Sequence, residues 1–478
     1  MTRITGLDDH SDRTIVVVGL GAAAVVLAAM AVFLNRASYS MAVGAVVAVL
    51  IVIASLPVFR WLARLDDDPA LVRILVFALV AKLVFSVARY WMVNRLYGGG
   101  GDSTRYASQG WEFAQQVRSG SLVPHIENID AVVDPTRRII KLTGYVFVVT
   151  GKSLFAGFFL YSWAAFWGCV LFVRGVRRAF PEMDQRRYLY LVMFWPSLLF
   201  WPSSIGKDAV MVLFLGVATY GACRLLAPRA QAIGLVPLGI GIGGMLLIRT
   251  HVALMAVLAL TVGAAFAIVG GARADSASGR ARAIRIASLA VLVVMSLFVA
   301  TQTSRFFSDI AGEATSGTDA LEITKRRTQQ GGSAFEPIVV TSPVQVPAAT
   351  ISVLFRPFPW EARNVGSMIS AGEAGLIAVL LAVSWKRLLR WPGSAWRRPV
   401  LVYSAAYCLM FVVAFSSIGN AGILARQRSQ MLPLLFVAVA VPATRWWCDK
   451  AADAAEPADG TSRGEVPRAD ERALLGGR

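Results

Sequence analysis

Apolar stretches long enough to cross a membrane recur along this chain, and they constrain its fold more than any other feature. A bilayer core is about 30 Å thick, and a helix needs about 20 apolar residues to cross it. Such stretches recur from Thr14 to Ala443. Hydrophobic residues make up 56% of the sequence and charged residues 16%, which is more apolar surface than a water-soluble domain can bury. Because unpaired backbone groups cannot face hydrocarbon, we expect an all-α, polytopic integral membrane protein.

The apolar stretches predict about twelve transmembrane helices. The first stretch follows Asp8 and Asp9, is long for a signal peptide and lacks a convincing cleavage site, so we expect it to remain as the first helix. The predicted helices cover residues 14–34, 40–58, 71–92, 153–173, 188–203, 208–226, 232–249, 252–270, 286–302, 367–385, 399–417 and 430–445.

Short arginine-rich segments predict which helix ends face the cytoplasm. If the helices alternate in direction, segments 174–187, 271–285 and 386–398 lie on one face. Arginine and lysine collect in short cytoplasmic loops, so this face is predicted to be cytoplasmic. The formal net charge of +18 is explained in the same way, and we expect no nucleic-acid partner.

Both termini are predicted to share the cytoplasmic face. Residues 1–13 would form a cytoplasmic N-terminus, and residues 14–445 a multi-pass transmembrane domain. Residues 446–478 are polar and lack apolar periodicity, which predicts a disordered cytoplasmic tail. The frequent arginine, alanine and valine residues are typical of a GC-rich bacterium, so the predicted location is the bacterial plasma membrane.

Two long segments, 93–152 and 303–366, fall on the outer face in this topology. Each contains an apolar stretch too short to span, at 139–150 and 344–355, which we expect to dip into the membrane or lie along its surface. Polar residues that need an explanation collect on this side. A functional site is therefore predicted at the outer face.

The first candidate motif lies just after the third helix, where four glycines separate Tyr97 from Asp102, and Arg105 and Tyr106 follow. Glycines allow a tight turn, and Asp102 then stands where a new helix would begin. One interpretation is that Asp102 only caps this helix. The other is that its carboxylate acts as a general base, or as a ligand of a divalent cation, at the membrane surface.

The second candidate motif joins the fifth and sixth helices, where the unit Phe-Trp-Pro-Ser occurs twice before Gly206 and Lys207. Two prolines break or kink the end of the fifth helix. Lys207 begins the sixth, and a helix N-terminus with a lysine and two serines suits a phosphate. The spacing is not that of a Walker A motif. The alternative is an interfacial aromatic belt with a snorkelling lysine.

A third set of charged residues lies in the outer segments. Arginines at a helix N-terminus oppose the macrodipole, so Arg426 and Arg428 call for a counter-anion, which a phosphate or pyrophosphate would supply. The alternative is internal pairing with Glu361 or Glu373. Arg249, at another outer turn, is a further candidate because ionisable groups at membrane depth usually face a cavity or partner. The set comprises Arg249, Arg356, Glu361, Arg363, Glu373, Arg426 and Arg428.

Three features together resemble the polytopic glycosyltransferases of the C superfamily, which include protein mannosyltransferase-like proteins and bacterial polysaccharide polymerases and ligases. They are Asp102 three residues before Arg105 and Tyr106, the Pro- and Ser-rich helix end that runs into Lys207, and the many helices with irregular outer loops. In that superfamily an acidic residue of the first large outer loop is a base or metal ligand, and Asp102 matches it. The usual second acidic neighbour is absent, because Ser103 follows.

The resemblance implies sugar transfer from a polyprenyl phosphate or pyrophosphate carrier to a glycan or other envelope acceptor on the outer membrane face. Asp102 or Glu373 would deprotonate the acceptor hydroxyl. Tyr106, Lys207 and the arginines would bind the substrate and stabilise the departing phosphate. Such a reaction needs no nucleotide, and the only cofactor to consider is a divalent cation at Asp102. The carrier-bound sugar, the acceptor and the lipid bilayer are thus the expected partners.

Two other classes of function fit parts of the pattern. A transporter or flippase for a lipid-linked or anionic envelope precursor would also have broken helices, intramembrane cations and about twelve spans. The first six predicted helices show no convincing repeat in the last six, and long outer loops are of more use to an enzyme. A noncatalytic partner in envelope biosynthesis is the third interpretation.

Overall fold

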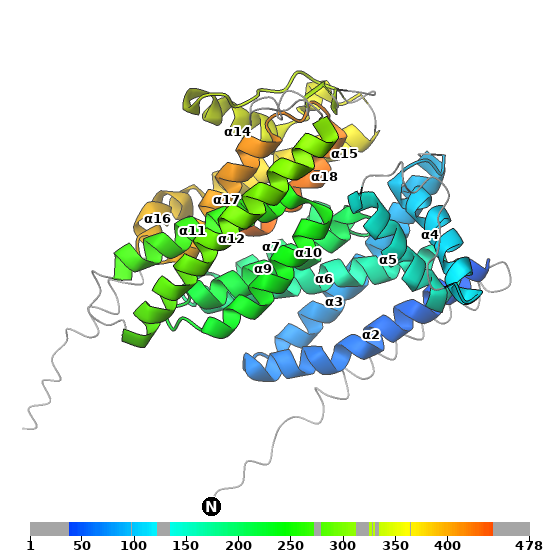
Figure 1. Cartoon of the computed structure of the whole chain (residues 1–478), viewed down its shortest axis with the longest axis horizontal. Helices are drawn as coiled ribbons and strands as arrows, with labels where there is room; N and C mark the ends of the chain where they lie inside the picture. Colours follow the sequence, from blue (N-terminus) through cyan, green and yellow to red (C-terminus); the bar gives the residue numbers. More distant parts are fainter. Residues whose placement is uncertain are drawn as a thin grey trace, which may run out of the picture. The chain divides into compact units, whose positions relative to one another are not determined.

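The computed structural model describes residues 38–96, 98–121, 134–271, 279–311, 325–326, 328–329, 334–363 and 365–442. Predicted segments 1–13, 14–34 and 446–478 lie outside these ranges. The described residues form helices and no β-strand, with one isolated bridge between Ala334 and Asn420. The predicted all-α class is confirmed (Figure 1).

The helices vary widely in length. Their bounds are α2 Tyr39–Leu65, α3 Ala70–Trp91, α4 Asp102–Arg118, α5 Asp134–Thr150, α6 Leu154–Ala179, α7 Gln185–Phe194, α8 Pro196–Phe200, α9 Lys207–Leu226, α10 Leu235–Ile248, α11 Thr250–Gly271, α12 Gly279–Ala311, α14 Val346–Phe355, α15 Val365–Val383, α16 Trp385–Ala395, α17 Pro399–Phe415, α18 Ala421–Arg428 and α19 Leu432–Val439. A π-helical turn, Met92–Leu96, continues α3, and short 3₁₀ turns cover Ala232–Gly234, Pro343–Gln345 and Pro359–Glu361.

Seven helices within the described residues are long and apolar enough to cross a membrane. They lie in α2, α3, α6, α9, α11, α12 and α15. An eighth span results if α16 and α17, which meet at a bend of 114°, are taken together. Membrane-protein character is therefore supported, whereas the predicted count of twelve spans is not confirmed.

Three predicted spans are shorter than expected. The stretch 188–203 is divided into α7, of 10 residues, and α8, of 5 residues, because Trp195 adopts an extended conformation before Pro196. Residues 430–442, the described part of the predicted span 430–445, contain α19, of 8 residues. Residues 232–249 yield a 3₁₀ turn and the 14-residue α10. Hydropathy alone does not register such breaks, since apolar composition continues across them.

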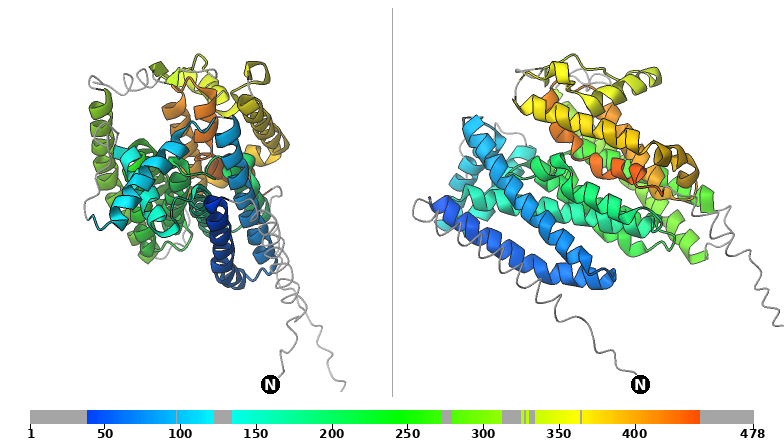
Figure 2. Two further views of the ribbon diagram at one scale, coloured as in Figure 1. Left: turned by 90° about the vertical axis from the view of Figure 1, so that its right-hand side faces the viewer. Right: turned by 180° about the vertical axis from the view of Figure 1, so that it is seen from behind.

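The two predicted outer loops are partly helical. Segment 93–152 contains α4 and α5, which pack against each other as a pair, and segment 303–366 contains α14. Figure 2 shows α4 and α5 beside the ends of α2 and α6. These helices cover one end of the long-helix bundle.

Glycines allow the central helices to approach closely. A Cβ atom added at Gly168 of α6 would lie 2.4 Å from the carbonyl oxygen of Val212 on α9, and one added at Gly241 of α10 would lie 2.4 Å from the backbone nitrogen of Ala218. Such contacts between backbones are typical of membrane helices, in which small residues form the interface. Helices α6, α9 and α10 therefore form a tightly packed centre.

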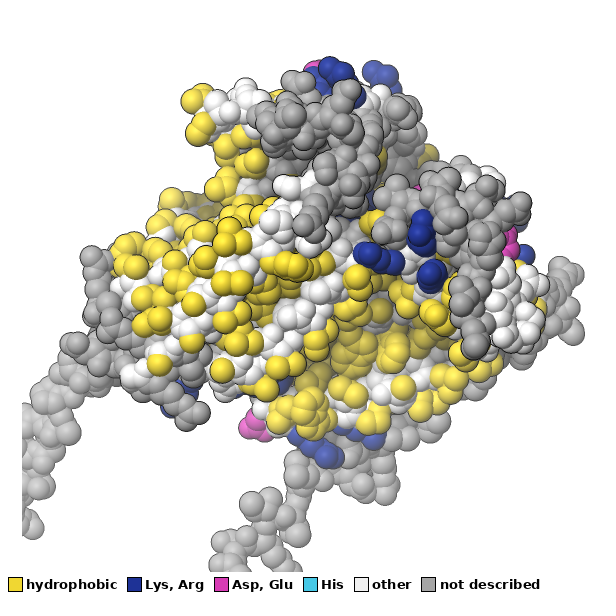
Figure 3. All heavy atoms as spheres, viewed as in Figure 1, with side chains coloured by type: hydrophobic (Ala, Val, Ile, Leu, Met, Phe, Trp, Pro, Cys, Tyr) yellow, Lys and Arg dark blue, Asp and Glu magenta, His cyan; other side chains and the backbone are white. Residues whose placement is uncertain are grey.

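The surface between the two ends of the bundle is apolar. Figure 3 shows hydrophobic side chains over α10, α11 and α12, with lysine and arginine side chains gathered nearer the margins of that face. One end carries ion pairs between arginines at or near helix ends and acids in the connecting segments, namely Arg174 and Arg177 with Asp66, Arg186 with Asp68, Arg387 with Asp184, and Arg398 with Glu182. The other end carries the site described next.

Candidate functional site

Asp102 begins α4 directly after the glycine-rich turn. Gly98, Gly99 and Gly101 have φ values of 59°, 76° and 132°, a region of the backbone map that glycine occupies far more readily than other residues. Gly101, not Asp102, occupies the N-cap position, and no side chain caps the helix. The Asp102 carboxylate instead faces Arg426, with Oδ2 lying 3.3 Å from Nη2. A capping role alone therefore does not account for Asp102.

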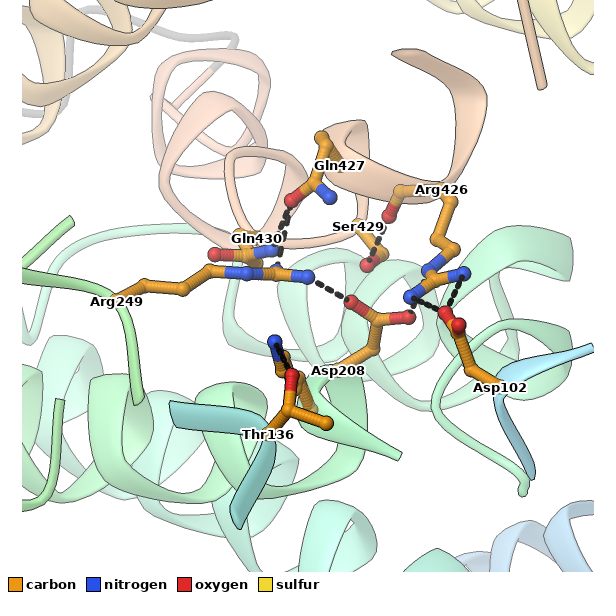
Figure 4. Close-up of polar contacts among 9 residues, drawn as sticks. Asp102, Thr136, Asp208, Arg249, Arg426, Gln427, Ser429 and Gln430 are labelled. Carbon is orange, nitrogen blue, oxygen red and sulfur yellow. Dashed lines mark hydrogen bonds and ion pairs between the residues drawn. The ribbon is translucent and has the colours of Figure 1, made fainter. Parts of the chain in front are cut away.

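Asp208, in the first turn of α9, is the centre of the site (Figure 4). Its Oδ1 accepts a hydrogen bond of 2.9 Å from Nη2 of Arg249. Its Oδ2 forms an ion pair with Nε of Arg426. One buried carboxylate thus holds two guanidinium groups from different parts of the chain. The Asp208 carboxylate also raises the pKa of Arg426 above its ordinary value, although burial of the guanidinium opposes this.

Arg249 and Arg426 reach Asp208 from opposite directions in Figure 4. Arg249 follows the last residue of α10, and its Nη1 donates a hydrogen bond of 2.8 Å to Oε1 of Gln427. Gln430 donates to the same oxygen at 2.7 Å. The two glutamines therefore fix one side of the Arg249 guanidinium, while Asp208 fixes the other.

Lys207 and Tyr106 complete the site. Nζ of Lys207 donates a hydrogen bond of 2.8 Å to Oγ1 of Thr136, whose hydroxyl also contacts the buried Tyr106. Burial, followed by the nearby Asp102 carboxylate, raises the pKa of Tyr106 to about 12. Tyr106 is therefore a neutral hydroxyl at neutral pH and can donate a hydrogen bond there.

The two carboxylates of the site differ in exposure. The Asp102 side chain is 57% exposed, whereas that of Asp208 is 8% exposed and holds both arginines. Lys207, Arg249 and Arg426 outnumber Asp102 and Asp208 by one positive charge. The arrangement can thus offer one accessible carboxylate as a proton acceptor beside a group of cations that favours an anion.

Glu373 and Arg428 do not contact this site. Oε1 of Glu373 accepts hydrogen bonds from Nε1 of Trp195, at 2.7 Å, and from the backbone nitrogen of Ser197, at 3.1 Å. Arg428 is fully buried and donates at 2.5 Å to the carbonyl oxygen of Leu354. The predicted sharing of one site by Glu373 and Asp102 is not supported. Glu373 instead stabilises the break between α7 and α8.

Arg356 and Arg363 belong to a separate part of the same end. Arg356 forms an ion pair with Glu361 at 3.2 Å and donates a hydrogen bond of 2.7 Å to the carbonyl oxygen of Glu336. The counter-ion of Arg356 is therefore an acid of the protein itself. Arg363 lines a pocket beside α15 and α18. Arg105 is exposed on α4, one residue before the buried Tyr106. Of the predicted set, Asp102, Tyr106, Lys207, Arg249 and Arg426 come together.

Asp208 is the site residue that the sequence reasoning missed. It follows Lys207 directly in the sequence, but the two arginines that it pairs with are distant along the chain, so its role as their counter-ion appears only in the folded structure. Thr136, Gln427 and Gln430 carried no sequence signal, because single polar residues near apolar stretches are common. Within the described ranges, no three His, Cys, Asp or Glu side chains group as metal ligands would.

No family model, curated protein or solved structure matches this chain. The functional argument therefore depends on the geometry and chemistry of the site.

Proposed function

We propose that this protein transfers a sugar from a polyprenyl phosphate or pyrophosphate carrier to an acceptor hydroxyl at the outer face of a bacterial plasma membrane. The observation that carries the proposal is the exposed Asp102 carboxylate beside Arg426 and Lys207, with Arg249 held by the adjacent Asp208. A base and an anion-binding group in one place are what this reaction needs. The site also lies at helix ends, where the headgroup of a lipid carrier would lie.

The proposed reaction has one base and one phosphate-binding group. Asp102 accepts the proton of the acceptor hydroxyl, whose oxygen forms a bond to the anomeric carbon of the donor sugar. The bond between that carbon and the phosphate oxygen breaks, and its electron pair leaves with the phosphate. Lys207 and the two arginines stabilise the charge that develops on this leaving group.

The Asp102–Arg426 contact connects the proposed base with the proposed phosphate-binding group. At 3.3 Å, with the Asp102 side chain 57% exposed, it is a weak ion pair. A donor phosphate would attract Arg426, loosen this pair and leave the carboxylate to act as a base. Asp208 would hold the two arginines throughout, since it is buried between them.

The position of the site favours transfer over transport. Transporters usually bind their substrate near the middle of the membrane, between broken helices. Here Asp102, Lys207 and Asp208 lie in the first turns of α4 and α9, and Arg249 follows the last turn of α10. A reaction with a headgroup at the membrane surface fits this position better.

The test is sugar transfer by the purified full-length protein in liposomes that contain synthetic polyprenyl-linked sugar donors. Lys207→Gln is compared with Lys141→Gln, which removes an exposed lysine of α5. We expect Lys207→Gln to raise the KM for the donor by about tenfold or more, because a charged hydrogen bond to phosphate is lost. Lys141→Gln should have little effect. Donor movement across the bilayer without a new glycosidic bond would contradict the proposal and indicate a flippase.

A further inference from the structure

Two stacked aromatic rings, the exposed Trp360 and the partly buried Phe358, lie between α14 and α15, in a part of the molecule that the proposed transfer step does not use. The Trp360 side chain is 80% exposed. Its ring stacks on that of Phe358, with ring centroids 4.9 Å apart and an angle of 13° between the ring planes. Large aromatic rings at a protein surface commonly mark a contact with a ligand or partner.

Arg356 and Glu361 hold the Phe358–Trp360 pair in place. The Arg356 guanidinium lies 4.6 Å from the ring centroid of Phe335 and 5.8 Å from that of Phe358. Glu361 pairs with Arg356 at 3.2 Å and accepts a hydrogen bond of 3.0 Å from the backbone nitrogen of Phe358. The short 3₁₀ turn Pro359–Glu361 is thereby fixed. The stacked rings of Phe358 and Trp360 thus form a fixed aromatic platform, and a fixed surface loses little conformational entropy when it binds a ligand.

A pocket of about 230 Å³ lies beside the platform. Its wall combines aromatic and apolar side chains with a carboxylate, a guanidinium and a hydroxyl. Arg363 is exposed and has no ion-pair partner among the residues that the structure describes. The lining residues are Ala334, Phe335, Pro357, Trp360, Glu361, Arg363, Ser367 and Ala421.

We infer that this pocket binds a pyranose unit of the acceptor glycan; the inference rests on the proposed function and names its acceptor. A pyranose ring has an apolar C–H face bordered by hydroxyls. Trp360 can cover that face, while Glu361 accepts and Arg363 donates hydrogen bonds at the hydroxyls. A phosphate fits less well, because Glu361 would repel it and the Arg356 guanidinium is already paired.

Helix α18 links this pocket to Asp102. Ala421, the first residue of α18, lines the pocket, and Arg426 of the same helix contacts Asp102. Five residues of helix span about 7.5 Å, a distance on the scale of a short oligosaccharide. The backbone nitrogen of Phe335 also donates a hydrogen bond of 2.9 Å to the carbonyl oxygen of Gly419, just before α18. The pocket and the Asp102–Arg426 contact therefore adjoin the same short helix.

The test is direct binding of sugar to the full-length protein in nanodiscs, with no donor present. The probes are maltotetraose, cellotetraose, mannotetraose and chitotetraose, and the readout is saturation-transfer NMR. We expect at least one probe to bind. Trp360→Ala should weaken its binding about tenfold through loss of the stacking ring, and Trp360→Phe should largely restore it. The matched control is Trp385→Ala, which removes a tryptophan that is 55% exposed on α16.

Three outcomes would overturn the inference. They are failure of all four probes to bind, equal binding by the Trp360→Ala variant, and quenching of Trp360 by brominated lipid, which would identify it as a membrane anchor. Trp360-dependent binding without any sugar transfer would reject the proposed function and leave the sugar site intact.

Discussion

The carboxylate of Asp208, in the first turn of α9, forms an ion pair with the guanidinium group of Arg426 on α18. The same carboxylate holds Arg249 at 2.9 Å, so the start of α9, the end of α10 and the more distant α18 meet at one acidic side chain. Asp102 then approaches Arg426 from α4. The site is thus assembled around a buried counter-ion, with its exposed carboxylate at the edge.

Asp208→Asn is expected to destabilise the protein strongly. It would leave the buried Arg249 without its counter-ion and Arg426 with only the exposed Asp102, and removal of one partner of a buried ion pair typically costs about 3–5 kcal/mol. Thermal unfolding in detergent measures the effect. Asp67→Asn, at an exposed residue with a φ of 48° that Asn tolerates, serves as the control. Equal melting temperatures for the two variants would rule out the central role of Asp208.

Glu373 is expected to act on folding and not on turnover. Glu373→Ala leaves two buried donors, Trp195 Nε1 and the Ser197 backbone nitrogen, without an acceptor, at a cost of about 1–3 kcal/mol each. Glu373→Gln keeps an oxygen at that position and should restore most of the stability and all of the transfer. If Glu373→Gln folds normally but has no activity, Glu373 is a catalytic base after all.

Tyr106 is expected to remain protonated until strongly alkaline pH. Its pKa is raised to about 12 in the folded protein, so the folded state keeps a proton that the unfolded chain loses near pH 10. The stability that Tyr106 contributes is therefore present below about pH 10 and is lost as the pH rises toward about 12. A difference titration of tyrosinate absorbance between the unaltered chain and Tyr106→Phe measures this. If Tyr106 loses its proton near pH 10, its side chain is not buried in the folded protein.

The two ends of the helix bundle are expected to lie on opposite sides of the membrane. In a chain whose four cysteines are replaced, Ser108→Cys lies near the site and Ala232→Cys near the arginine-rich end, and both positions are exposed. An impermeant maleimide added outside intact cells should label position 108 and not position 232. Labelling of position 232 alone would reverse the predicted orientation, and labelling of both would reject the membrane topology.

The sequence predicted the features that depend on composition and local turn chemistry. The all-α class followed from apolar stretches, and the start of α4 at Asp102 followed from the preceding glycines. Lys207, which follows two prolines, was predicted to begin the next helix, and it begins α9. The topology also predicted that Asp102, Lys207 and the outer-side arginines share one site. Arg249 and Arg426 lie in that site, whereas Arg356, Arg363 and Arg428 lie elsewhere.

The remaining features depend on long-range packing. The neighbouring sequence does not distinguish Asp208, which binds two arginines, from Glu373, which stabilises the break between α7 and α8. Arg426 and Arg428 look alike in sequence, yet they lie on different sides of α18 and contact Asp102 and Leu354, respectively. The extended Trp195 before Pro196 interrupts an apolar stretch without changing its hydropathy, so the number of spans was predicted less well.

The central claim is that Asp102 is the base of a sugar-transfer site, and the most direct test compares Asp102→Asn with Glu112→Gln. Glu112 is an exposed acid on the same helix α4, outside the site. Transfer from a polyprenyl-linked donor and binding of that donor are both measured in liposomes. Loss of the base should lower kcat at least about a hundredfold in Asp102→Asn, with donor binding preserved and Glu112→Gln unchanged. Full turnover by a folded Asp102→Asn protein would contradict the account.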